Sequence, residues 1–200
     1  MNEIKIETHP LEPFIPSNAR ILMLGTFPPK KERWSMNFFY PNKINDMWRI
    51  MGVIFYDNKD RFWDNENKRF ILDDIKQFLT EKGIALFDTA YKVRRLKDNA
   101  SDKFLDIVEP SNVAQMLLDN PSITAIVTAG EKATETLAQM FSSPVPNMGE
   151  HTEFQFNDRT ITHYRTPSSS RAYPLSLNKK AEAYAKIFIS QGYDISKKNA

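Results

Sequence analysis

The sequence predicts an α/β fold, a three-layer α/β/α sandwich around a central, mainly parallel sheet of four strands. Two observations predict it. Four short apolar runs are typical of strands that are covered on both faces. Helical patterns separate these runs, so that strand and helix alternate about four times. The 200 residues suit one domain, because domains typically contain about 100 to 200 residues. We expect its core over residues 14–190 and a tail over residues 191–200.

The first strand is expected at residues 21–24, an apolar run that ends at Gly25. The other strands are expected at residues 84–87, 123–127 and 160–164. Residues 57–69 are polar, charged and free of glycine, which indicates an exposed connection or an insertion. Open parallel sheets bind ligands outside the carboxyl ends of their strands. We therefore expect the functional residues in the segments that follow the four apolar runs.

Apolar residues at helical spacing predict the helices. They are expected over residues 70–82, 113–117 and 131–141, from Asn178 onward, and from a start near Asp46. Gly83 is a suitable C-terminal cap for the first of these. Ser111 or Asn112 is a suitable N-cap for the second.

The composition excludes several kinds of site. Without cysteine there is no disulfide, no Cys-ligated zinc, no iron–sulfur cluster and no thiol nucleophile. The three histidines, His9, His151 and His163, are far apart in sequence, and His163 within the last strand suits a core residue. No glycine-rich phosphate loop and no G-x-S-x-G turn occurs. We expect no cofactor and no metal.

The charge distribution is more informative than the net charge of +2. Residues 92–97 carry four positive side chains and no acid, and residues 159–181 carry five and no acid. Such clusters suit either nucleic-acid contacts or solvated basic loops. No apolar run approaches the roughly 20 residues that a membrane helix needs. With no apolar signal core near Met1, we expect a cytoplasmic protein that does not contact a membrane.

Two segments after the expected strands are long, residues 28–44 and 165–177, which is typical of functional loops. The first contains Phe38, Phe39 and Tyr40 in succession, an aromatic run that suits stacking on a base. Alternatively, Phe38, Phe39 and Trp48 fill the core beneath the loop. The second offers hydroxyl and guanidinium groups over residues 165–171 with no carboxylate among them. It suits phosphate contacts or is an ordinary Ser/Pro loop.

Together these segments resemble the uracil-DNA glycosylase superfamily. Proteins of its mismatch-specific branch begin with a strand that is followed by G-x-N-P-G, an aromatic residue and N-x-F-W. In this chain the first expected strand is followed in the same order by residues 25–29, the aromatic loop, Asn45 and Trp48. The loop at residues 167–170 resembles the second motif of the superfamily. The likeness is greatest to the hypoxanthine-DNA glycosylase branch, whose third segment reads like residues 83–88. The resemblance spans roughly residues 20–187.

The resemblance implies a monofunctional DNA glycosylase that acts as a monomer in base excision repair. It would hydrolyse the N-glycosidic bond of uracil or hypoxanthine flipped out of DNA, so its partner is DNA with a damaged or mismatched base. Asn45 takes the catalytic position. The residues expected to contact the base are Gly25, Thr26, Phe27, Phe39, Tyr40 and Asp88. Those expected to contact DNA are Pro167, Ser168, Ser169, Ser170, Arg171, Lys92, Arg94 and Arg95.

The sequence departs from the family pattern at three places. Phe27 stands where the mismatch-specific branch has an Asn that positions water, and phenylalanine cannot perform that task. Arg171 replaces the proline that ends the second motif. The segment over residues 91–101 lacks the C-x-R-x-G-S-like pattern of the hypoxanthine branch.

Each assigned residue also has a structural interpretation. Asn45 suits a helix N-cap, Asp88 could satisfy backbone donors at a strand end, and Tyr40 could be a core aromatic. Two other functions therefore stay open. One is a glycosylase-like protein that binds a base, nucleotide or nucleic acid without cleaving it. The other is an N-glycosidase that acts on a free nucleoside or small metabolite.

Overall fold

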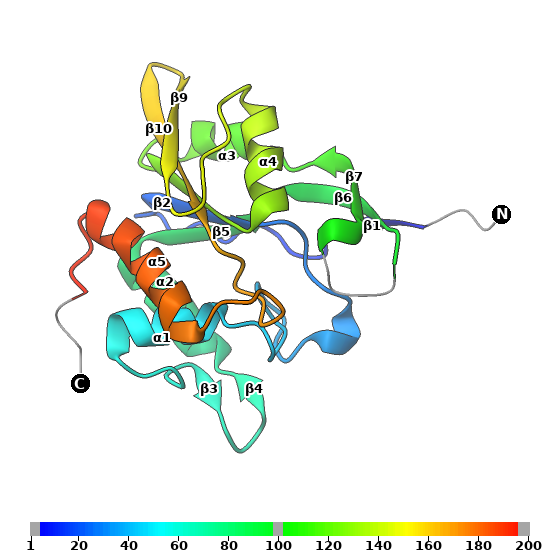
Figure 1. Cartoon of the computed structure of the whole chain (residues 1–200), viewed down its shortest axis with the longest axis vertical. Coiled ribbons are helices and arrows are strands. Elements are labelled where there is room, and N and C mark those ends of the chain that lie inside the picture. Colours follow the sequence, from blue (N-terminus) through cyan, green and yellow to red (C-terminus); the bar gives the residue numbers. More distant parts are fainter. Residues whose placement is uncertain (1–4, 98–101, 196–200) are drawn as a thin grey trace.

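The computed structural model describes residues 5–97 and 102–195. Its central sheet has the strand order β5-β2-β8-β10-β9 (Figure 1). The strands are β2 (Ile21–Gly25), β5 (Ile84–Asp88), β8 (Ala125–Ala129), β9 (His151–Phe156) and β10 (Arg159–Thr166). Strands β5, β2, β8 and β10 are parallel, which confirms the four predicted strands. The fifth, β9, pairs antiparallel with β10 at the edge and was not predicted.

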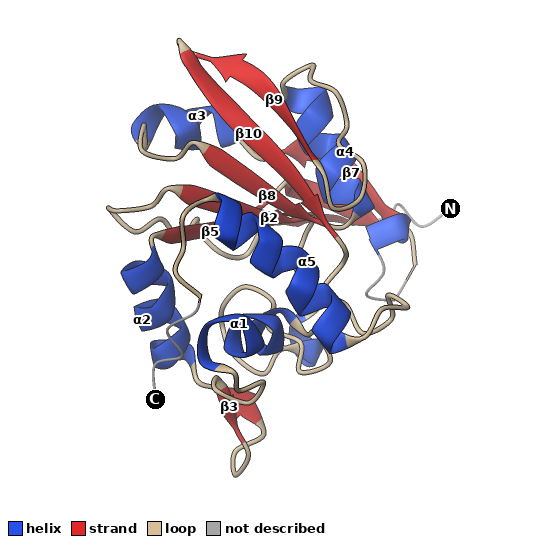
Figure 2. Ribbon diagram, turned by 60° about the vertical axis from the view of Figure 1, so that its left-hand side comes forward, coloured by secondary structure: helices blue, strands red, loops and turns tan. Residues whose placement is uncertain are grey.

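Helices cover both faces of this sheet, as the alternating pattern predicted. They are α1 (Met47–Tyr56), α2 (Leu72–Lys82), α3 (Val113–Asp119), α4 (Glu131–Met140) and α5 (Leu177–Ser190). Helices α1, α2 and α5 lie on one face, and α3 and α4 lie on the other (Figure 2). The predicted caps are confirmed: Gly83 ends α2 with φ +64°, and the Asn112 side chain accepts from the Gln115 N–H at the start of α3.

A second, antiparallel sheet was not predicted from the sequence. It has the order β1-β6-β7 and consists of β1 (Ile6–Thr8), β6 (Ala90–Arg95) and β7 (Leu105–Pro110). Only Thr89 separates β5 from β6, so this sheet begins directly at the carboxyl end of β5. Pairing of β1 with β6 brings the N-terminal segment, including His9, to the same place.

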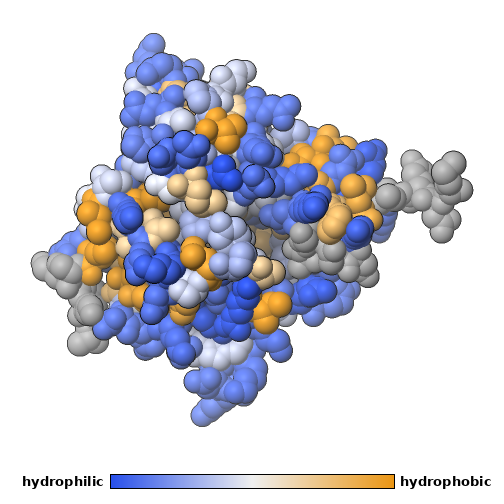
Figure 3. Space-filling view, in the orientation of Figure 1, coloured by the Kyte–Doolittle hydropathy of each residue, from blue (hydrophilic) through white to orange (hydrophobic). Residues whose placement is uncertain are grey.

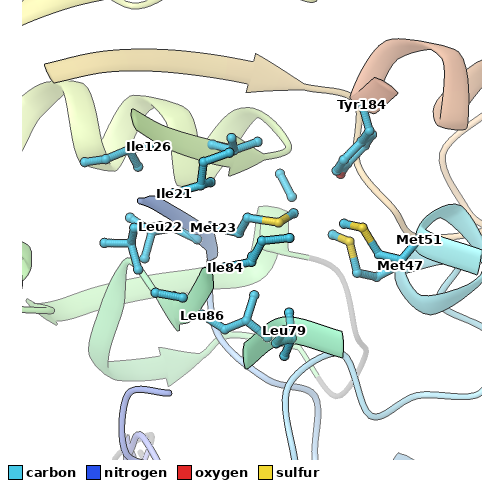
Figure 4. Packing of buried hydrophobic residues seen from close by; sticks show 14 of the residues in the cluster. Ile21, Leu22, Met23, Met47, Met51, Leu79, Ile84, Leu86, Ile126 and Tyr184 are labelled. Carbon is cyan, nitrogen blue, oxygen red and sulfur yellow. The ribbon is translucent and has the colours of Figure 1, made fainter. Parts of the chain in front are cut away.

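The core lies on both sides of β2, every residue of which is buried. Met47 and Met51 of α1 point toward Met23 of β2 (Figure 4). Unbranched methionine side chains fill such irregular space between a sheet and its helices. Packing on both faces of β2 therefore holds its carboxyl end, at Gly25, in place.

Residues 57–69 are mostly exposed, as expected, although Phe62 is buried. They include β3 (Trp63–Asp64), which forms a hairpin with β4 (Arg69–Phe70) at the end of the segment. The segment after α5 differs from the expected tail, because Tyr193 is buried against Phe55 and Phe188. The rest of the expected tail, residues 196–200, lies outside the described residues.

The surface facing the viewer in Figure 1 is largely hydrophilic, with hydrophobic side chains in separate groups (Figure 3). Across residues 5–97 and 102–195, no helix has the length and apolar character needed to span a membrane.

Candidate functional site

The site is centred on Gly25, where β2 ends opposite Asp88 of β5. A Cβ atom on Gly25 would lie 2.5 Å from Asp88 Oδ1 and 3.3 Å from the Tyr40 hydroxyl. The first distance is shorter than real Cβ contacts, so glycine is required for close approach. Because Gly25 has no side chain, the Asp88 carboxylate and the Tyr40 hydroxyl can both lie close to its Cα atom.

Tyr40 has an unusual backbone conformation and an unpaired hydroxyl. Its φ of +50° lies in the left-handed region, which bulky residues adopt rarely and mostly at functional sites. Its ring packs edge-on against Trp48, and its hydroxyl is buried without a hydrogen-bond partner among the described residues. Burial, and then the negative charge of Asp88, raise the pKa of this phenol well above its usual value. The hydroxyl therefore keeps its proton and is available as a donor.

The Asp88 carboxylate supplies an acceptor beside this donor. The Asp88 side chain is buried, and its Oδ2 lies 2.9 Å from His9 Nε2. Its other oxygen, Oδ1, lies beside Gly25, at the same position that the Tyr40 hydroxyl approaches. A planar ring that carries N–H next to C=O has the complementary pattern of one donor and one acceptor.

Asp102 is a second carboxylate near this edge, and no local sequence signal pointed to it. It begins the short 3-10 helix η2 (Asp102–Phe104). Burial raises the pKa of Asp102 to about 6, and the charge of Asp88 adds to the effect, while the nearby Thr26 hydroxyl opposes it. That hydroxyl is itself buried without a hydrogen bond of ordinary geometry. Polar groups thus gather around the end of β2 without being fully satisfied.

The two long loops lie far apart in sequence but against each other in the structure. Asn45 forms an isolated β-bridge with Ser170, and the Asp46 N–H donates to the Ser169 carbonyl at 2.8 Å. The Asn45 side chain accepts from the Met47 N–H at 2.9 Å through Oδ1. Its amide nitrogen makes no hydrogen bond with the described residues, which leaves it available to a ligand or water.

Asp46 holds the two loops together through charge. Its carboxylate lies 2.8 Å from Arg171 Nε and 3.2 Å from Lys180 Nζ. Lys180 is fully buried on α5 and also donates to the Ser170 carbonyl at 2.8 Å. Asp46 therefore pairs with Arg171, although residues 159–181 themselves contain no acidic residue.

The remaining residues of the second loop are held by nearby elements. The Pro167 carbonyl accepts from the hydroxyl of Tyr184 on α5 at 3.0 Å, and Ser168 Oγ accepts from the Ser170 N–H at 3.2 Å. The Ser168 side chain also lies beside Gly130, at the carboxyl end of β8. This places the serine loop along the same edge of the sheet as Gly25.

The aromatic residues of the first loop separate into two groups. Phe38, Phe39 and Trp48 are buried in the core, which matches the structural interpretation given to them. Phe39 packs against Phe38 and Phe87 and is 2% exposed, so it does not offer a free stacking face. Tyr40 is only partly buried and is the member of the three that reaches the site.

The basic residues of β6 are paired with acids from neighbouring strands. Lys92 lies 2.6 Å from Glu109, Arg94 lies 3.2 Å from Asp106, and Arg95 lies 3.0 Å from Glu7. The segment lacks acids in sequence, but β1 and β7 supply them in space. Arg95 also donates to the Pro28 carbonyl at 3.2 Å and so anchors the loop that follows Gly25.

Within the described ranges, no three His, Asp or Glu side chains gather as a metal site would require. His163 is a core residue, as expected, with Nε2 2.9 Å from Thr128 Oγ1, and burial lowers its pKa to about 4. A cavity of about 410 Å³ lies between β1, Phe27–Pro29 and Trp34. A similar one of about 430 Å³ between α1 and α2 is remote from Gly25 and is lined mainly by polar and charged side chains.

Comparison with known proteins supports the fold. No protein-family model matches the sequence, and no curated protein matches it. Among solved structures, the chain is similar to a "putative Uracil DNA glycosylase" from Methanosarcina acetivorans, solved by NMR. The TM-score is 0.58 with 21% identity, over 94% of this chain and all of that one. The chain therefore has a uracil-DNA glycosylase-like fold.

Proposed function

We propose that this protein is a DNA glycosylase that hydrolyses the N-glycosidic bond of uracil or hypoxanthine. The observation that carries the proposal is the convergence of Asp88 Oδ1 and the Tyr40 hydroxyl next to Gly25. Both bases carry a ring N–H beside a carbonyl. The N–H would donate to Asp88, and the carbonyl would accept from Tyr40. The similarity to the hypoxanthine-DNA glycosylase branch in sequence supports the same substrate class.

In the proposed reaction the target nucleotide first leaves the DNA stack, which costs a few kcal/mol. The bond between the sugar C1′ and the base nitrogen then breaks, and the base leaves with the bonding electrons. The Tyr40 hydroxyl stabilises the negative charge that develops on the base carbonyl, as a fixed donor does in an oxyanion hole. Water adds its oxygen to C1′, and its proton is finally taken up by the departing base.

Asn45 would orient this water through its amide nitrogen. The position is supported by the bridge to Ser170, which joins Asn45 to the serine loop. That loop, from Pro167 to Arg171, would contact the phosphates that flank the flipped nucleotide through its hydroxyl and N–H groups. Lys92, Arg94 and Arg95 would contact phosphates only by exchanging their present partners Glu109, Asp106 and Glu7 for them.

The test is an excision assay on labelled duplexes that carry one uracil, hypoxanthine, xanthine or G·T mismatch. We expect alkali-labile product from the wild type with uracil or hypoxanthine, and a loss of about 100-fold or more in Asn45→Ala. Asn42→Ala is the matched control, because Asn42 lies in the same loop and its side chain accepts from the Ile44 N–H in the same way. Equal activity in both variants would remove Asn45 from the mechanism.

A second candidate is a protein of this fold that binds a base or nucleic acid without cleaving it. Two observations favour it: Phe27 occupies the position of the water-holding Asn, and Asn45 Oδ1 is already engaged by the Met47 N–H. Salt-sensitive DNA binding with no product on any of the four substrates would establish this alternative.

A further inference from the structure

His9 is buried beside the site, although it lies far from the other site residues in sequence. The backbone N–H of His9 donates to the backbone carbonyl of Tyr91 in β6 at 2.8 Å, which holds the His9 backbone in place. Its ring packs against Phe27 and Phe87 with centroid distances of 5.3 and 4.6 Å. The His9 side chain is fully buried and has little freedom to turn.

Both ring nitrogens of His9 have partners. Nε2 lies 2.9 Å from Asp88 Oδ2, and since a carboxylate only accepts, Nε2 carries the proton. Nδ1 lies 2.9 Å from the Leu11 carbonyl and 3.2 Å from the Leu11 N–H. A neutral ring can accept from the Leu11 N–H, and a protonated ring can donate to the Leu11 carbonyl. The bond to Asp88 is therefore retained in either protonation state.

This arrangement determines which way the Asp88 carboxylate faces. A buried carboxylate needs a partner, and His9 supplies one for Oδ2. With Oδ2 held on that side, the side chain cannot rotate, and Oδ1 stays next to Gly25 and the Tyr40 hydroxyl. Without His9, Asp88 would lose its 2.9 Å contact, and its side chain would be free to turn away from Gly25.

We propose that His9 is the residue that sets base specificity, by holding Asp88 so that its Oδ1 stays beside Gly25 as an acceptor that requires a ring N–H on the base. This proposal deepens the proposed function and rests on it. Bases with an unsubstituted lactam N–H are accepted. Bases whose equivalent nitrogen lacks hydrogen leave Asp88 Oδ1 unpaired and are rejected, because sites built to hydrogen-bond a substrate discriminate strongly against analogues that lack the group.

The test compares excision of the preferred base with excision of the same base methylated at that ring nitrogen. His9→Phe keeps the aromatic packing and removes the hydrogen bond, whereas His9→Gln keeps an N–H donor. We expect His9→Phe to lower kcat/KM for the preferred base about 10- to 100-fold and to reduce discrimination against the methylated base by a similar factor. His9→Gln should restore most of that discrimination.

His163→Phe is the matched control, because His163 is also buried and hydrogen-bonded but faces Thr128 in the core. It should affect stability without changing the ratio between the two bases. Unchanged discrimination in a folded His9→Phe variant overturns the proposal.

A second readout separates failure of this proposal from failure of the proposed function. In ¹⁵N-labelled wild type, the His9 Nε2–H should give a slowly exchanging imidazole signal that Asp88→Ala abolishes. Its absence from the wild type overturns the hydrogen-bonded pair itself. If the signal is present but no base is excised, the proposed function is refuted, and the specificity role of His9 is refuted with it.

Discussion

Removing the Tyr40 hydroxyl should make the protein more stable and less active. In Tyr40→Phe the ring and its packing against Trp48 remain, and only a buried hydroxyl without a partner is lost. Leaving such a group unpaired costs about 1–3 kcal/mol. We therefore expect the free energy of unfolding to rise by about 1 kcal/mol. For a chain of this size that corresponds to an increase in Tm of roughly 2–4 °C.

Tyr184→Phe is the control with the opposite expected sign. Tyr184 is also buried, but its hydroxyl donates to the Pro167 carbonyl at 3.0 Å. Removal of this hydroxyl leaves the Pro167 carbonyl unpaired, so we expect the free energy of unfolding to fall by about 1 kcal/mol. Urea unfolding followed by tryptophan fluorescence measures both changes. A Tyr40→Phe variant that is less stable than the wild type would refute the view that the hydroxyl is held unpaired for a ligand.

Three further outcomes are expected. Lys180→Met removes one partner of the buried Asp46 carboxylate, whereas the other partner, Arg171, remains. We therefore expect the free energy of unfolding, measured in urea, to fall by about 3 kcal/mol, at the low end of the range for breaking a buried ion pair. Gly25→Ala places a methyl group against Asp88 Oδ1, so excision should fall at least about 10-fold, with a stability loss of about 1–3 kcal/mol. Because the folded pKa of Asp102 is raised to about 6, its protonated form stabilises the fold at low pH. That contribution is lost as the pH rises from about 4 to 6, so the Tm of Asp102→Asn should rise relative to wild type over this interval.

Each of these predictions has a result that contradicts it. Lys179→Met is the control for the buried lysine, because Lys179 is exposed on the same helix and pairs with exposed Glu182. It should change stability by no more than about 0.5 kcal/mol. A similarly small effect of Lys180→Met would contradict the role given to Asp46. Unchanged excision in Gly25→Ala would show that no ligand group approaches there, and a pH-independent Tm difference for Asp102→Asn would exclude its raised pKa.

The parallel sheet could be predicted because its strands are buried on both faces. Continuous apolar runs such as Ile21 to Leu24 have few other structural explanations. The antiparallel sheet was missed, because the two buried residues of β6, Ala90 and Val93, are three positions apart and do not show the alternation that is typical of a half-buried strand. Its charged side chains were interpreted as a basic cluster, because their acidic partners come from β1 and β7. Spacing along one segment does not report pairing between segments.

The site could be predicted only in part, because only some of its residues carry a local sequence signal. Gly25 and Asp88 stand at the ends of predicted strands, and Tyr40 belongs to an unusual run of aromatic residues. These local signals predicted that the three residues lie at one edge of the sheet. His9 carried no such signal, since 79 residues separate it from Asp88 and nothing in its segment indicates a buried ring. Phe39 illustrates the reverse limit, because adjacent aromatics look alike in sequence and only packing separates a core residue from one at the site.

The most direct test of the central claim is release of free base from duplex DNA by the wild type and by Asp88→Asn. Asparagine keeps the shape of the side chain and can still accept from His9, but it is a neutral amide and no longer an ionised acceptor at Gly25. We predict that the wild type releases uracil or hypoxanthine in a single-turnover assay and that Asp88→Asn slows release by about 100-fold. Equal release by both proteins, or none by a wild type that binds the duplex, would contradict the account.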